Sequence, residues 1–238
     1  MLSTWIRHWV NSENATQPLA RCVLCLAPSD QAGLCRSCVA DLPDNPVACE
    51  RCALPLSLPK VDRLCRACRE RMPPQDFCLA PWRYEFPVDC MIQQYKYHGW
   101  RAPGRALALN WVGQCARRPW SQPDLLLPAP IAPERLQERG FNQAAEIGDW
   151  LSQATGITMN AALLARRPGY QAQAGLGRAE RRDNLRGAFF LRKDSQLPAH
   201  VAIVDDVITT GASGEAMATC LRKAGVARVD LWALARTP

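Results

Sequence analysis

Two adjacent carboxylates, Asp205 and Asp206, lie between an apolar run and a turn that is rich in hydroxyl groups. The run 201–204 predicts a buried strand, and the periodic apolar residues of 216–221 predict an amphipathic helix after the turn. Because the first amides of a helix lack intrahelical partners and its dipole is positive at that end, this turn can bind a phosphate group. The predicted phosphate loop consists of Thr209, Thr210, Gly211, Ala212 and Ser213.

The two acids extend this prediction beyond the phosphate itself. A phosphate in the loop would place both carboxylates near an attached sugar, where they suit ribose hydroxyls or a magnesium ion. The turn lacks the Gly-Lys-Ser/Thr of a P-loop and the Gly-x-Gly-x-x-Gly of a dinucleotide-binding turn, which disfavours nucleoside triphosphates and NAD. The pattern favours a ribose 5-phosphate with further anionic groups. The alternative is an ordinary buried strand followed by a capped helix.

Most of the 12 cysteines occur as Cys-x-x-Cys pairs, whose members are Cys22 and Cys25, Cys35 and Cys38, Cys49 and Cys52, and Cys65 and Cys68. Two such pairs can surround one tetrahedral zinc ion, so we expect a double zinc ribbon with two structural zinc ions. In the simplest pairing the first four cysteines bind one ion and the last four bind the other, but a crossed pairing also fits the spacing. A redox dithiol or disulfides are the alternative. The unpaired cysteines, expected to be buried thiols, are Cys78, Cys90, Cys115 and Cys220.

Basic residues gather in three further places. Lys96 lies in the last turn of a helix that is predicted over 88–97 and ends at Gly99. A loop over 129–143 follows a predicted strand over 124–128, so it could face the same crevice as the phosphate loop at the carboxyl edge of an α/β sheet. The candidate residues of this second loop are Arg135, Arg139, Gly140, Asn142 and Gln143.

The third basic segment, 166–185, combines arginines and glycines with few apolar residues. Guanidinium groups match phosphate oxygens in bidentate geometry, and a mobile segment can close over a reaction that water would spoil. The candidate residues of this segment are Gln173, Arg178, Arg181, Arg182 and Asn184. A flexible linker with a solvated basic face, or a site for single-stranded nucleic acid, would use the same residue types.

The length of 238 residues allows one ordinary domain and a small one. The chain carries a net charge of +7 and is 48% hydrophobic. The chain has no apolar run long enough for a membrane span and no signal-peptide pattern at its N-terminus, so we expect a cytoplasmic protein. Further elements are predicted as a strand over 80–86 and helices over 101–118 and 144–154. The expected domains are an N-terminal extension over 1–20, the double zinc ribbon over 21–72, a linker over 73–79 and a main domain over 80–238.

The stretch around Asp205 resembles the phosphoribosyl pyrophosphate (PRPP) loop of type I phosphoribosyltransferases, with an apolar strand, two acids, two apolar residues and Thr-Thr-Gly. Together with the cysteine pairs and the motifs 96–99, 139–143 and 173–184, it resembles the ComF/GntX family. These are phosphoribosyltransferase-like proteins linked to competence and the use of external DNA. The resemblance, which covers 22–237, implies an α/β domain with a mostly parallel sheet flanked by helices, preceded by a small zinc-ribbon module.

The resemblance also implies roles for single residues. Asp205 and Asp206 would contact ribose and magnesium, and the loop 209–213 would bind the 5-phosphate. Arg139 and its neighbours would form the pyrophosphate loop, Lys96 would contact pyrophosphate, and the arginines of the third basic segment would form the closing loop. The implied catalytic residues are Asp205, Asp206, Arg139 and Lys96.

The implied reaction is magnesium-dependent transfer of phosphoribose from PRPP to an unknown acceptor, with release of pyrophosphate. Two positions depart from the family pattern. Tyr170 stands where many members have Thr, and Thr209 stands where purine phosphoribosyltransferases usually carry the acid that handles the proton of the base. The second departure fits an acceptor that needs no general base, or a protein that binds PRPP without catalysis. The alternative function is a PRPP- or nucleotide-sensing protein of the competence machinery that binds single-stranded DNA.

Overall fold

The computed structural model describes residues 19–58, 62–115, 121–169, 185, 187–192 and 197–238. The strands are β1 (Leu19–Arg21), β2 (Pro28–Gln31), β3 (Phe77–Leu79), β4 (Trp82–Arg83), β5 (Leu125–Pro128), β6 (Leu164–Arg166), β7 (Phe189–Leu191), β8 (His200–Ile208) and β9 (Arg228–Arg236). The helices are α2 (Arg36–Ala40), α3 (Arg66–Glu70), α4 (Val88–His98), α5 (Arg101–Cys115), α6 (Pro133–Arg139), α7 (Gln143–Thr155) and α9 (Ala212–Lys223).

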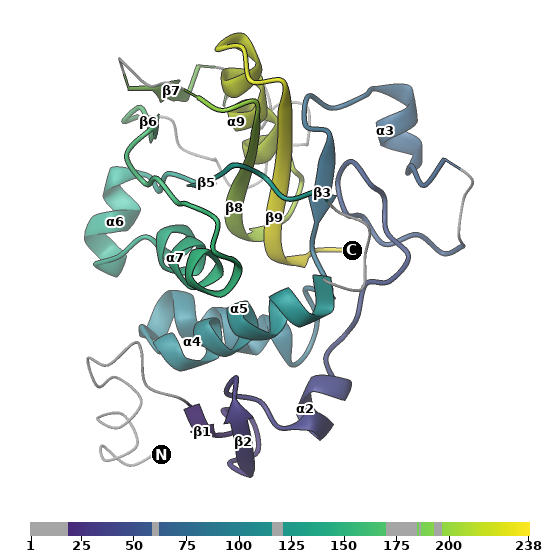
Figure 1. Cartoon of the computed structure of the whole chain (residues 1–238), viewed down its shortest axis with the longest axis vertical. Coiled ribbons are helices and arrows are strands. Elements are labelled where there is room, and N and C mark those ends of the chain that lie inside the picture. Colours follow the sequence, from purple (N-terminus) through teal and green to yellow (C-terminus); the bar gives the residue numbers. More distant parts are fainter. Residues whose placement is uncertain (1–18, 59–61, 116–120, 170–184, 186, 193–196) are drawn as a thin grey trace.

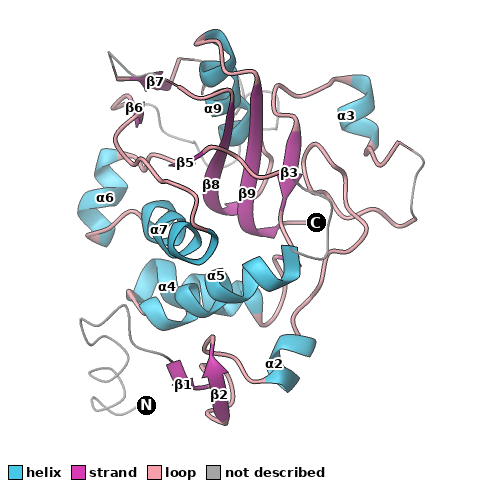
Figure 2. Cartoon of the chain, in the orientation of Figure 1, coloured by secondary structure: helices cyan, strands magenta, loops and turns pink. Residues whose placement is uncertain are grey.

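A parallel sheet in the order β3-β9-β8-β5, with β4 also paired to β9, forms the centre of the described part of the chain (Figure 1). The register of its two long strands runs from His200 opposite Arg228 to Ile208 opposite Arg236. Both strands are buried along most of their length, as expected of parallel strands that helices cover on both faces (Figure 2). The mostly parallel α/β fold predicted from the sequence is confirmed.

Helices cover the two faces of the sheet unequally. α4, α5 and α7 pack on one face, and α9 packs on the other. Successive residues of a strand point to opposite faces, so Ala202 and Val204 of β8 join the first core while Val201 and Ile203 join the second. This alternation also decides where the polar residues at the end of β8 point.

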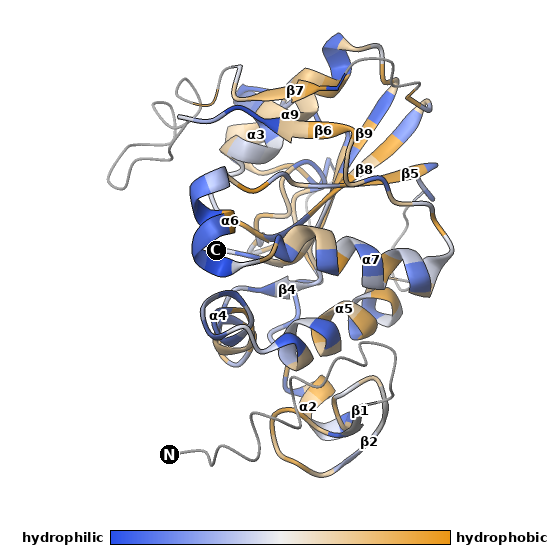
Figure 3. Cartoon of the chain, turned by 90° about the vertical axis from the view of Figure 1, so that its left-hand side faces the viewer, coloured by the Kyte–Doolittle hydropathy of each residue, from blue (hydrophilic) through white to orange (hydrophobic). Residues whose placement is uncertain are grey.

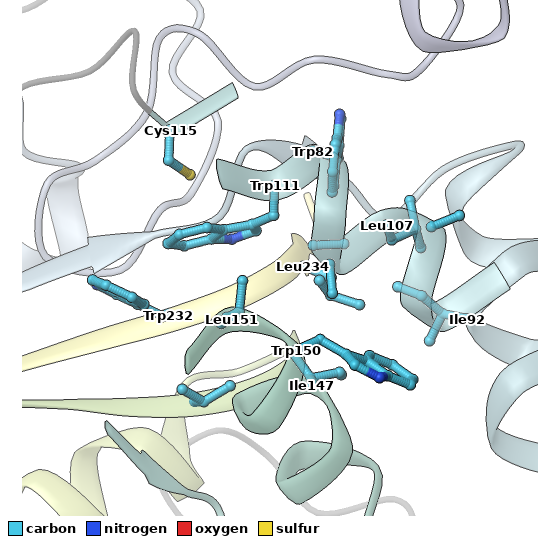
Figure 4. Packing of buried hydrophobic residues seen from close by; sticks show 14 of the residues in the cluster. Trp82, Ile92, Leu107, Trp111, Cys115, Ile147, Trp150, Leu151, Trp232 and Leu234 are labelled. Atoms are coloured by element: carbon cyan, nitrogen blue, oxygen red, sulfur yellow. The ribbon is translucent and has the colours of Figure 1, made fainter. Parts of the chain in front are cut away.

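A pair of tryptophans forms the centre of the first core (Figure 4). The ring centroids of Trp111 on α5 and Trp232 on β9 lie 4.8 Å apart. The indole N–H of Trp111 donates to the carbonyl of Ala233 at 2.9 Å, which satisfies the polar atom of a fully buried side chain. These contacts fix α5 to the sheet.

Several predicted helices agree closely with the structure. α4 ends at Gly99, which adopts a left-handed φ of 66° as the C-cap. α5 begins at Arg101 as predicted and is described as far as Cys115. α7 covers the helix predicted over 144–154.

The predicted strand 80–86 is wrong in its bounds, because only 82–83 of these residues form a strand, β4. Pro81, which directly precedes β4, has no N–H to donate to a ladder, and β3 ends before it at Leu79. β3 begins at Phe77, so the segment 73–79, predicted as a linker, ends inside the sheet. Residues 1–18 of the predicted N-terminal extension lie outside the described residues.

The prediction of an uninterrupted loop over 129–143 is also wrong, because this segment contains α6. α6 has Pro133 at its first turn and ends at Gly140, whose φ of 76° is left-handed. Its residues between these ends are mainly hydrophilic and exposed (Figure 3). The helix therefore lacks the apolar periodicity by which a sequence reveals an amphipathic helix.

The cysteine-rich segment forms two lobes at separate places on the main domain (Figure 1). The lobe of β1, β2 and α2 lies beyond α5, where the side-chain N–H of Asn110 donates to the carbonyl of Ala32 at 3.1 Å. The lobe of α3 lies beside β3, where the N–H of Cys78 donates to the carbonyl of Glu50 at 2.7 Å. No helix in the described part of the chain combines the length and the apolar character needed to cross a bilayer.

The contact of α4 with α5 gives a first stability test. A Cβ added at Gly104 would lie 2.7 Å from the ring of Tyr95, which is fully buried and cannot move aside. We expect Gly104→Ala to lower the free energy of unfolding by about 1–3 kcal/mol, as overpacking does. Urea denaturation with an unchanged m-value would measure this loss.

The matched control is Gly113→Ala on the same helix. A Cβ at Gly113 meets no atom within 4 Å, so this change should raise the free energy of unfolding by about 0.5–1 kcal/mol through helix propensity. Equal effects of the two substitutions would contradict the close packing of Gly104 on Tyr95.

Candidate functional site

A pocket of about 60 Å³ lies at the carboxyl end of β8. Its lining includes Asp205 and every residue of the predicted phosphate loop, 209–213. Gly211 is the N-cap of α9 and has a φ of 80°, a left-handed conformation that glycine adopts without strain. The hydroxyl of Thr210 accepts a hydrogen bond from the amide of Ala212 at 3.4 Å. The loop thus leads from the end of β8 directly into the positive end of a helix.

Gly214 is a further pocket residue that the sequence analysis missed. A Cβ at this position would lie 2.6 Å from Cδ1 of Leu231 on β9, so the first turn of α9 approaches the sheet where only glycine fits without movement. A glycine in the first turn of a predicted helix was the available signal, since it is otherwise unfavourable there.

The two acids at the end of β8 point to different faces of the sheet. Asp205 lines the pocket, whereas Asp206 is buried and pairs with Lys96 of α4, with its Oδ1 2.9 Å from Nζ. Strand alternation explains this separation. The structure therefore brings together Asp205 with the phosphate loop, and Asp206 with Lys96.

Burial, and after it the neighbouring Asp206 carboxylate, raise the pKa of Asp205, which lies at about 7. The amide of Asp206, which donates to Oδ1 of Asp205 at 2.8 Å, and the positive charges of Lys96 and Arg166 oppose this rise in pKa. Near neutral pH the Asp205 carboxyl is divided between its two protonation states. A cation or a hydroxyl donor in the pocket would favour the charged form.

Arg166 at the end of β6 is a second residue without an assigned role in the sequence analysis. Burial lowers the pKa of its guanidinium, the positive charge of Arg135 lowers it further, and the negative charges of Glu134 and Asp205 oppose this lowering. Its Cζ lies 5.6 Å from the ring centroid of Phe189. Arg166 therefore adds a partly buried positive charge on the side of Asp205 and α6.

The residues of the second basic loop lie on and after α6. Arg135 is exposed, and Arg139 is the last residue of the helix, with Gly140 as its C-cap. Cζ of Arg139 lies 5.2 Å from the ring centroid of Tyr97, whose exposed fraction is 68%. Tyr97 follows Lys96 on α4, so the structure brings the Arg139 guanidinium close to the Lys96 end of α4.

Two predicted residues of this loop have structural contacts that explain their presence. Asn142 is the N-cap of α7: its side-chain oxygen accepts from the amide of Ala144 at 3.0 Å, and its side-chain Nδ2 donates to the carbonyl of Ala129 at 3.1 Å. The carbonyl of Gln143 accepts from the hydroxyl of Tyr95 at 3.1 Å. Both positions tie α7 to its surroundings.

All candidate residues of the third basic segment lie outside the described residues: Gln173, Arg178, Arg181, Arg182 and Asn184. Tyr170 lies outside them as well. The described hairpin of β6 and β7 forms the base of this segment, with Arg166 opposite Phe189.

Two groups of four cysteines that could hold a metal ion occur among the described residues. The first centre is Cys22, Cys25, Cys35 and Cys38, and the second centre is Cys49, Cys52, Cys65 and Cys68. Within each centre the Sγ atoms lie within 4.8 Å of one another. The simplest of the predicted pairings is confirmed.

The two centres repeat one local design. Each begins with a knuckle, the turn formed by its first Cys-x-x-Cys pair, 22–25 or 49–52. In the first centre, the N–H of Cys22 donates to the carbonyl of Ala27 and the N–H of Leu26 donates to the carbonyl of Cys22. In the second centre, the N–H of Cys49 donates to the carbonyl of Leu54 and the N–H of Ala53 donates to the carbonyl of Cys49. In each, the residue after the knuckle, Leu26 or Ala53, has a left-handed φ. In each, the third cysteine, Cys35 or Cys65, is the N-cap of a short helix.

The spacing of the sulfur atoms fits tetrahedral zinc. A Zn–S bond of about 2.3 Å places two sulfur ligands about 3.8 Å apart. The Sγ atoms of Cys52 and Cys65 are 3.7 Å apart, and those of Cys25 and Cys35 are 3.5 Å apart. The second centre is entirely buried, whereas Cys25 of the first is exposed. Zinc bound at the two centres would supply stability that the small lobes cannot obtain from packing alone.

The remaining cysteines agree only partly with the prediction of buried thiols. Cys78 and Cys115 are buried, and burial raises the pKa of the Cys78 thiol well above its usual value. Cys220 is half-buried, and Cys90 is exposed on α4, so the prediction is wrong for these two. Cys90 lies on the outer side of an amphipathic helix, which spacing to other cysteines does not reveal.

The fold and its sites define a class of protein: an α/β domain with a loop pocket at the end of a parallel strand, joined to a module with two four-cysteine centres. The chain is 31% identical over 224 residues to a Haemophilus influenzae protein named Competence protein F, covering 91% of this chain and 96% of that protein. It is 30% identical over 222 residues to DNA utilization protein YhgH of Salmonella typhimurium, with the same coverage of 91% and 96%.

A Streptococcus pneumoniae protein named Competence protein ComFC is 30% identical over 107 residues, which is 45% of this chain and 46% of that protein. No family model matches the chain. The chain belongs to the ComF family, as its full-length similarity to Competence protein F shows.

The two centres predict the metal content. We expect the purified protein to contain two zinc ions per chain, one for each four-cysteine group. Cys52→Ser should remove one ion and cost more stability than Cys25→Ser, because Cys52 is 4% exposed and Cys25 is on the surface. Elemental analysis and thermal denaturation would measure both effects. Disulfides in the protein purified under reducing conditions would contradict this assignment.

The raised pKa of Asp205 predicts how stability depends on pH. The unfolded carboxyl titrates near 3.9, at about its reference value, and the folded one at about 7. Between these values the folded state binds more protons than the unfolded state, so this residue makes stability fall as pH rises. Asp205→Asn should therefore raise the melting temperature at pH 8 by clearly more than at pH 4.

Asp206→Asn is the matched control for this measurement. It removes the partner of Lys96 and should destabilise the protein by on the order of 3 kcal/mol, as breaking a buried ion pair does. The prediction for Asp205 fails if Asp205→Asn has the same effect at both pH values.

Proposed function

We propose that this protein binds PRPP with magnesium at the pocket of Asp205 and transfers phosphoribose to an acceptor in DNA uptake or utilisation. The observation that carries the proposal is that Asp205 and all five predicted loop residues line one pocket at the carboxyl end of β8. The names of the relatives in Haemophilus influenzae and Salmonella typhimurium support the DNA context. A cytoplasmic location and the division into residues 21–72 and 80–238 belong to the same proposal.

The phosphate loop would hold the 5-phosphate of PRPP. The amides of the first turn of α9 and the hydroxyls of Thr209, Thr210 and Ser213 would be the donors to the phosphate in this loop. The phosphate would fix the sugar at the end of β8, with its hydroxyl groups within reach of Asp205. Asp205 would accept hydrogen bonds from these hydroxyls in its charged form.

Asp205 is also the carboxylate that could hold magnesium, since it is the acid that lines the pocket. Magnesium bound there would neutralise the charge of the departing pyrophosphate. Asp206, implied by the family resemblance as a second ligand, is held by Lys96 on the other face of the strand. The Lys96 ammonium is therefore already paired with Asp206, and it would have to exchange partners to contact pyrophosphate.

The basic side chains around the pocket would stabilise pyrophosphate. Arg166 and Arg135 are electrostatic neighbours of the Asp205 region, and Arg139 lies near the end of α4. In the transfer, the bond from C1 of ribose to the pyrophosphate oxygen breaks, and pyrophosphate leaves with the electron pair. A lone pair of the acceptor then forms the new bond to C1, and a hydrogen carried by the attacking atom leaves as a proton to water. The arginines of 178–182 would close over it, as the family resemblance implies.

A second function, a PRPP- or nucleotide-sensing protein that binds single-stranded DNA, is favoured by a specific surface feature. Arg139 stacks on the exposed Tyr97, and Cζ of Arg101 lies 5.4 Å from the ring centroid of Phe141. Aromatic rings interleaved with cations suit stacked bases and phosphates. Thr209, in place of the acid of purine enzymes, is also compatible with binding without catalysis.

Calorimetric titration of PRPP, with and without magnesium, tests the proposed function. We expect magnesium-dependent binding that is weakened at least about tenfold, or about 1.4 kcal/mol, by the combined changes Asp205→Asn and Asp206→Asn. The control is Asp149→Asn, which changes an exposed acid on α7. Release of pyrophosphate in the presence of bases, nucleotides or DNA would then identify the acceptor.

An intact protein that binds no PRPP would overturn the transferase proposal. Salt-sensitive binding of a single-stranded oligonucleotide, with PRPP left intact, would favour the second function instead.

A further inference from the structure

The knuckle of the second cysteine centre is tied to the main sheet by its backbone carbonyl groups. The carbonyl of Glu50 accepts from the amide of Cys78 on β3 at 2.7 Å. The carbonyl of Ala53 accepts from Nδ2 of Asn45 at 2.9 Å, and the same Nδ2 donates to the carbonyl of Ala80 at 3.2 Å. The knuckle is thus part of the structure at the edge of the sheet.

Arg236, the last residue of β9, extends this connection to the phosphate loop. Its Nε–H donates to the carbonyl of Cys52 at 2.9 Å, and its Nη1–H donates to the carbonyl of Ile208 at 3.3 Å. Ile208 is the last residue of β8 and directly precedes Thr209. One guanidinium therefore joins a ligand residue of the second centre to the residue from which the phosphate loop starts.

The burial of the Arg236 side chain makes the positions of the Cys52 and Ile208 carbonyl groups depend on each other. Arg236 is 4% exposed, so water cannot replace a carbonyl that moves away. The guanidinium is planar and its donors are fixed relative to one another, so a shift of the Cys52 carbonyl changes the direction of the donor toward Ile208. The amide of Thr237 donates to the same Ile208 carbonyl at 3.0 Å, so this amide is sensitive to the position of the carbonyl.

The conformation of the knuckle in turn depends on the cysteine centre. Ala53, which directly follows Cys52, adopts a φ of 54°, in the left-handed region that disfavours residues with a Cβ; its amide donates to the carbonyl of Cys49 at 2.8 Å and its side chain is buried in the second core. A metal ion that joins the four sulfur atoms would stabilise this conformation. Without it, the knuckle loses the constraint that places the Cys52 carbonyl.

We propose that Arg236 is a positioning residue that couples the second cysteine centre to the phosphate loop, so that metal bound at this centre orders the loop. The first centre lies instead against the core on the other face of the sheet, where Asn110 of α5 donates to the carbonyl of Ala32. The proposal concerns the shape of the loop and holds whether the protein transfers phosphoribose or only binds a phosphorylated ligand. Because coupling of two sites is reciprocal, an anion in the loop would also slow metal release from the second centre.

Hydrogen exchange of single amides, followed by NMR, tests this coupling. Two amides report on the loop: Thr237, which donates to Ile208, and Glu215, which donates to the carbonyl of Gly211 at 2.9 Å. The amide of Gly156, which donates to Ser152 at 2.8 Å at the end of α7, serves as the remote reference. We expect Cys52→Ser to speed exchange at Thr237 and Glu215 by roughly tenfold relative to Gly156.

Cys25→Ser, which removes a ligand of the first centre, should leave the ratio of the loop amides to Gly156 unchanged. The same acceleration at all three amides in the Cys52 variant would show only a general loss of stability and would overturn the proposal. This comparison needs no ligand, so its outcome is separate from that of the PRPP titration.

Arg236→Lys tests the connection while both cysteine centres stay intact, and it remains informative if Cys52→Ser does not fold. A lysine keeps the charge but cannot reach two carbonyls with a fixed fork. It should accelerate Thr237 and Glu215 with the metal content unchanged, and adding Cys52→Ser should then cause little further acceleration.

Arg222→Lys is the matched control. Arg222, which is half-buried, is another arginine that joins distant segments, with Nε donating to the carbonyl of Pro74 at 3.2 Å, but it lies at the far end of α9. Its replacement should not selectively accelerate the loop amides. Equal effects of the two arginine changes, or none at Arg236, would refute the coupling.

Discussion

The pairing of β8 with β9 is the interaction on which the rest of the structure depends. These two parallel strands are paired from His200–Arg228 to Ile208–Arg236 and are buried on both faces, so their backbone groups depend on hydrogen bonds to each other and to the flanking strands. The helices of both faces pack on the side chains of this pair. The same strands end at the pocket, and the long buried ladder therefore fixes the position from which the phosphate loop emerges.

Much of the fold could be predicted because its signals are local. The apolar run 201–204, the glycine caps and the spacing of the cysteine pairs each depend on neighbours within a few residues, and the elements and centres they predict are present. α6 escaped prediction because helix formation there depends on its proline start and glycine end and not on an apolar stripe. The bounds of β4 within the predicted strand 80–86 required knowing that it pairs with the end of β9, far away in the chain.

The candidate site shows where the sequence alone is insufficient. The pocket combines Asp205 with the phosphate loop, which adjacency in the chain could predict. The pairing of Asp206 with Lys96, the charge of Arg166 near Asp205 and the bond of Arg236 to Cys52 join residues that are far apart in the chain. Such contacts follow only from the packing of α4, β6 and the cysteine lobes around the sheet.

The hydrogen bond from Cys78 of β3 to the carbonyl of Glu50 affects how the protein can associate with itself. An unpaired edge of a sheet is a template for another strand, and proteins protect such edges by covering them. The second cysteine lobe covers the β3 edge, while the segment around Met159, which bridges to Leu126, covers the β5 edge. The lobe thus shields the β3 edge, and its unfolding would leave a strand edge open to intermolecular pairing.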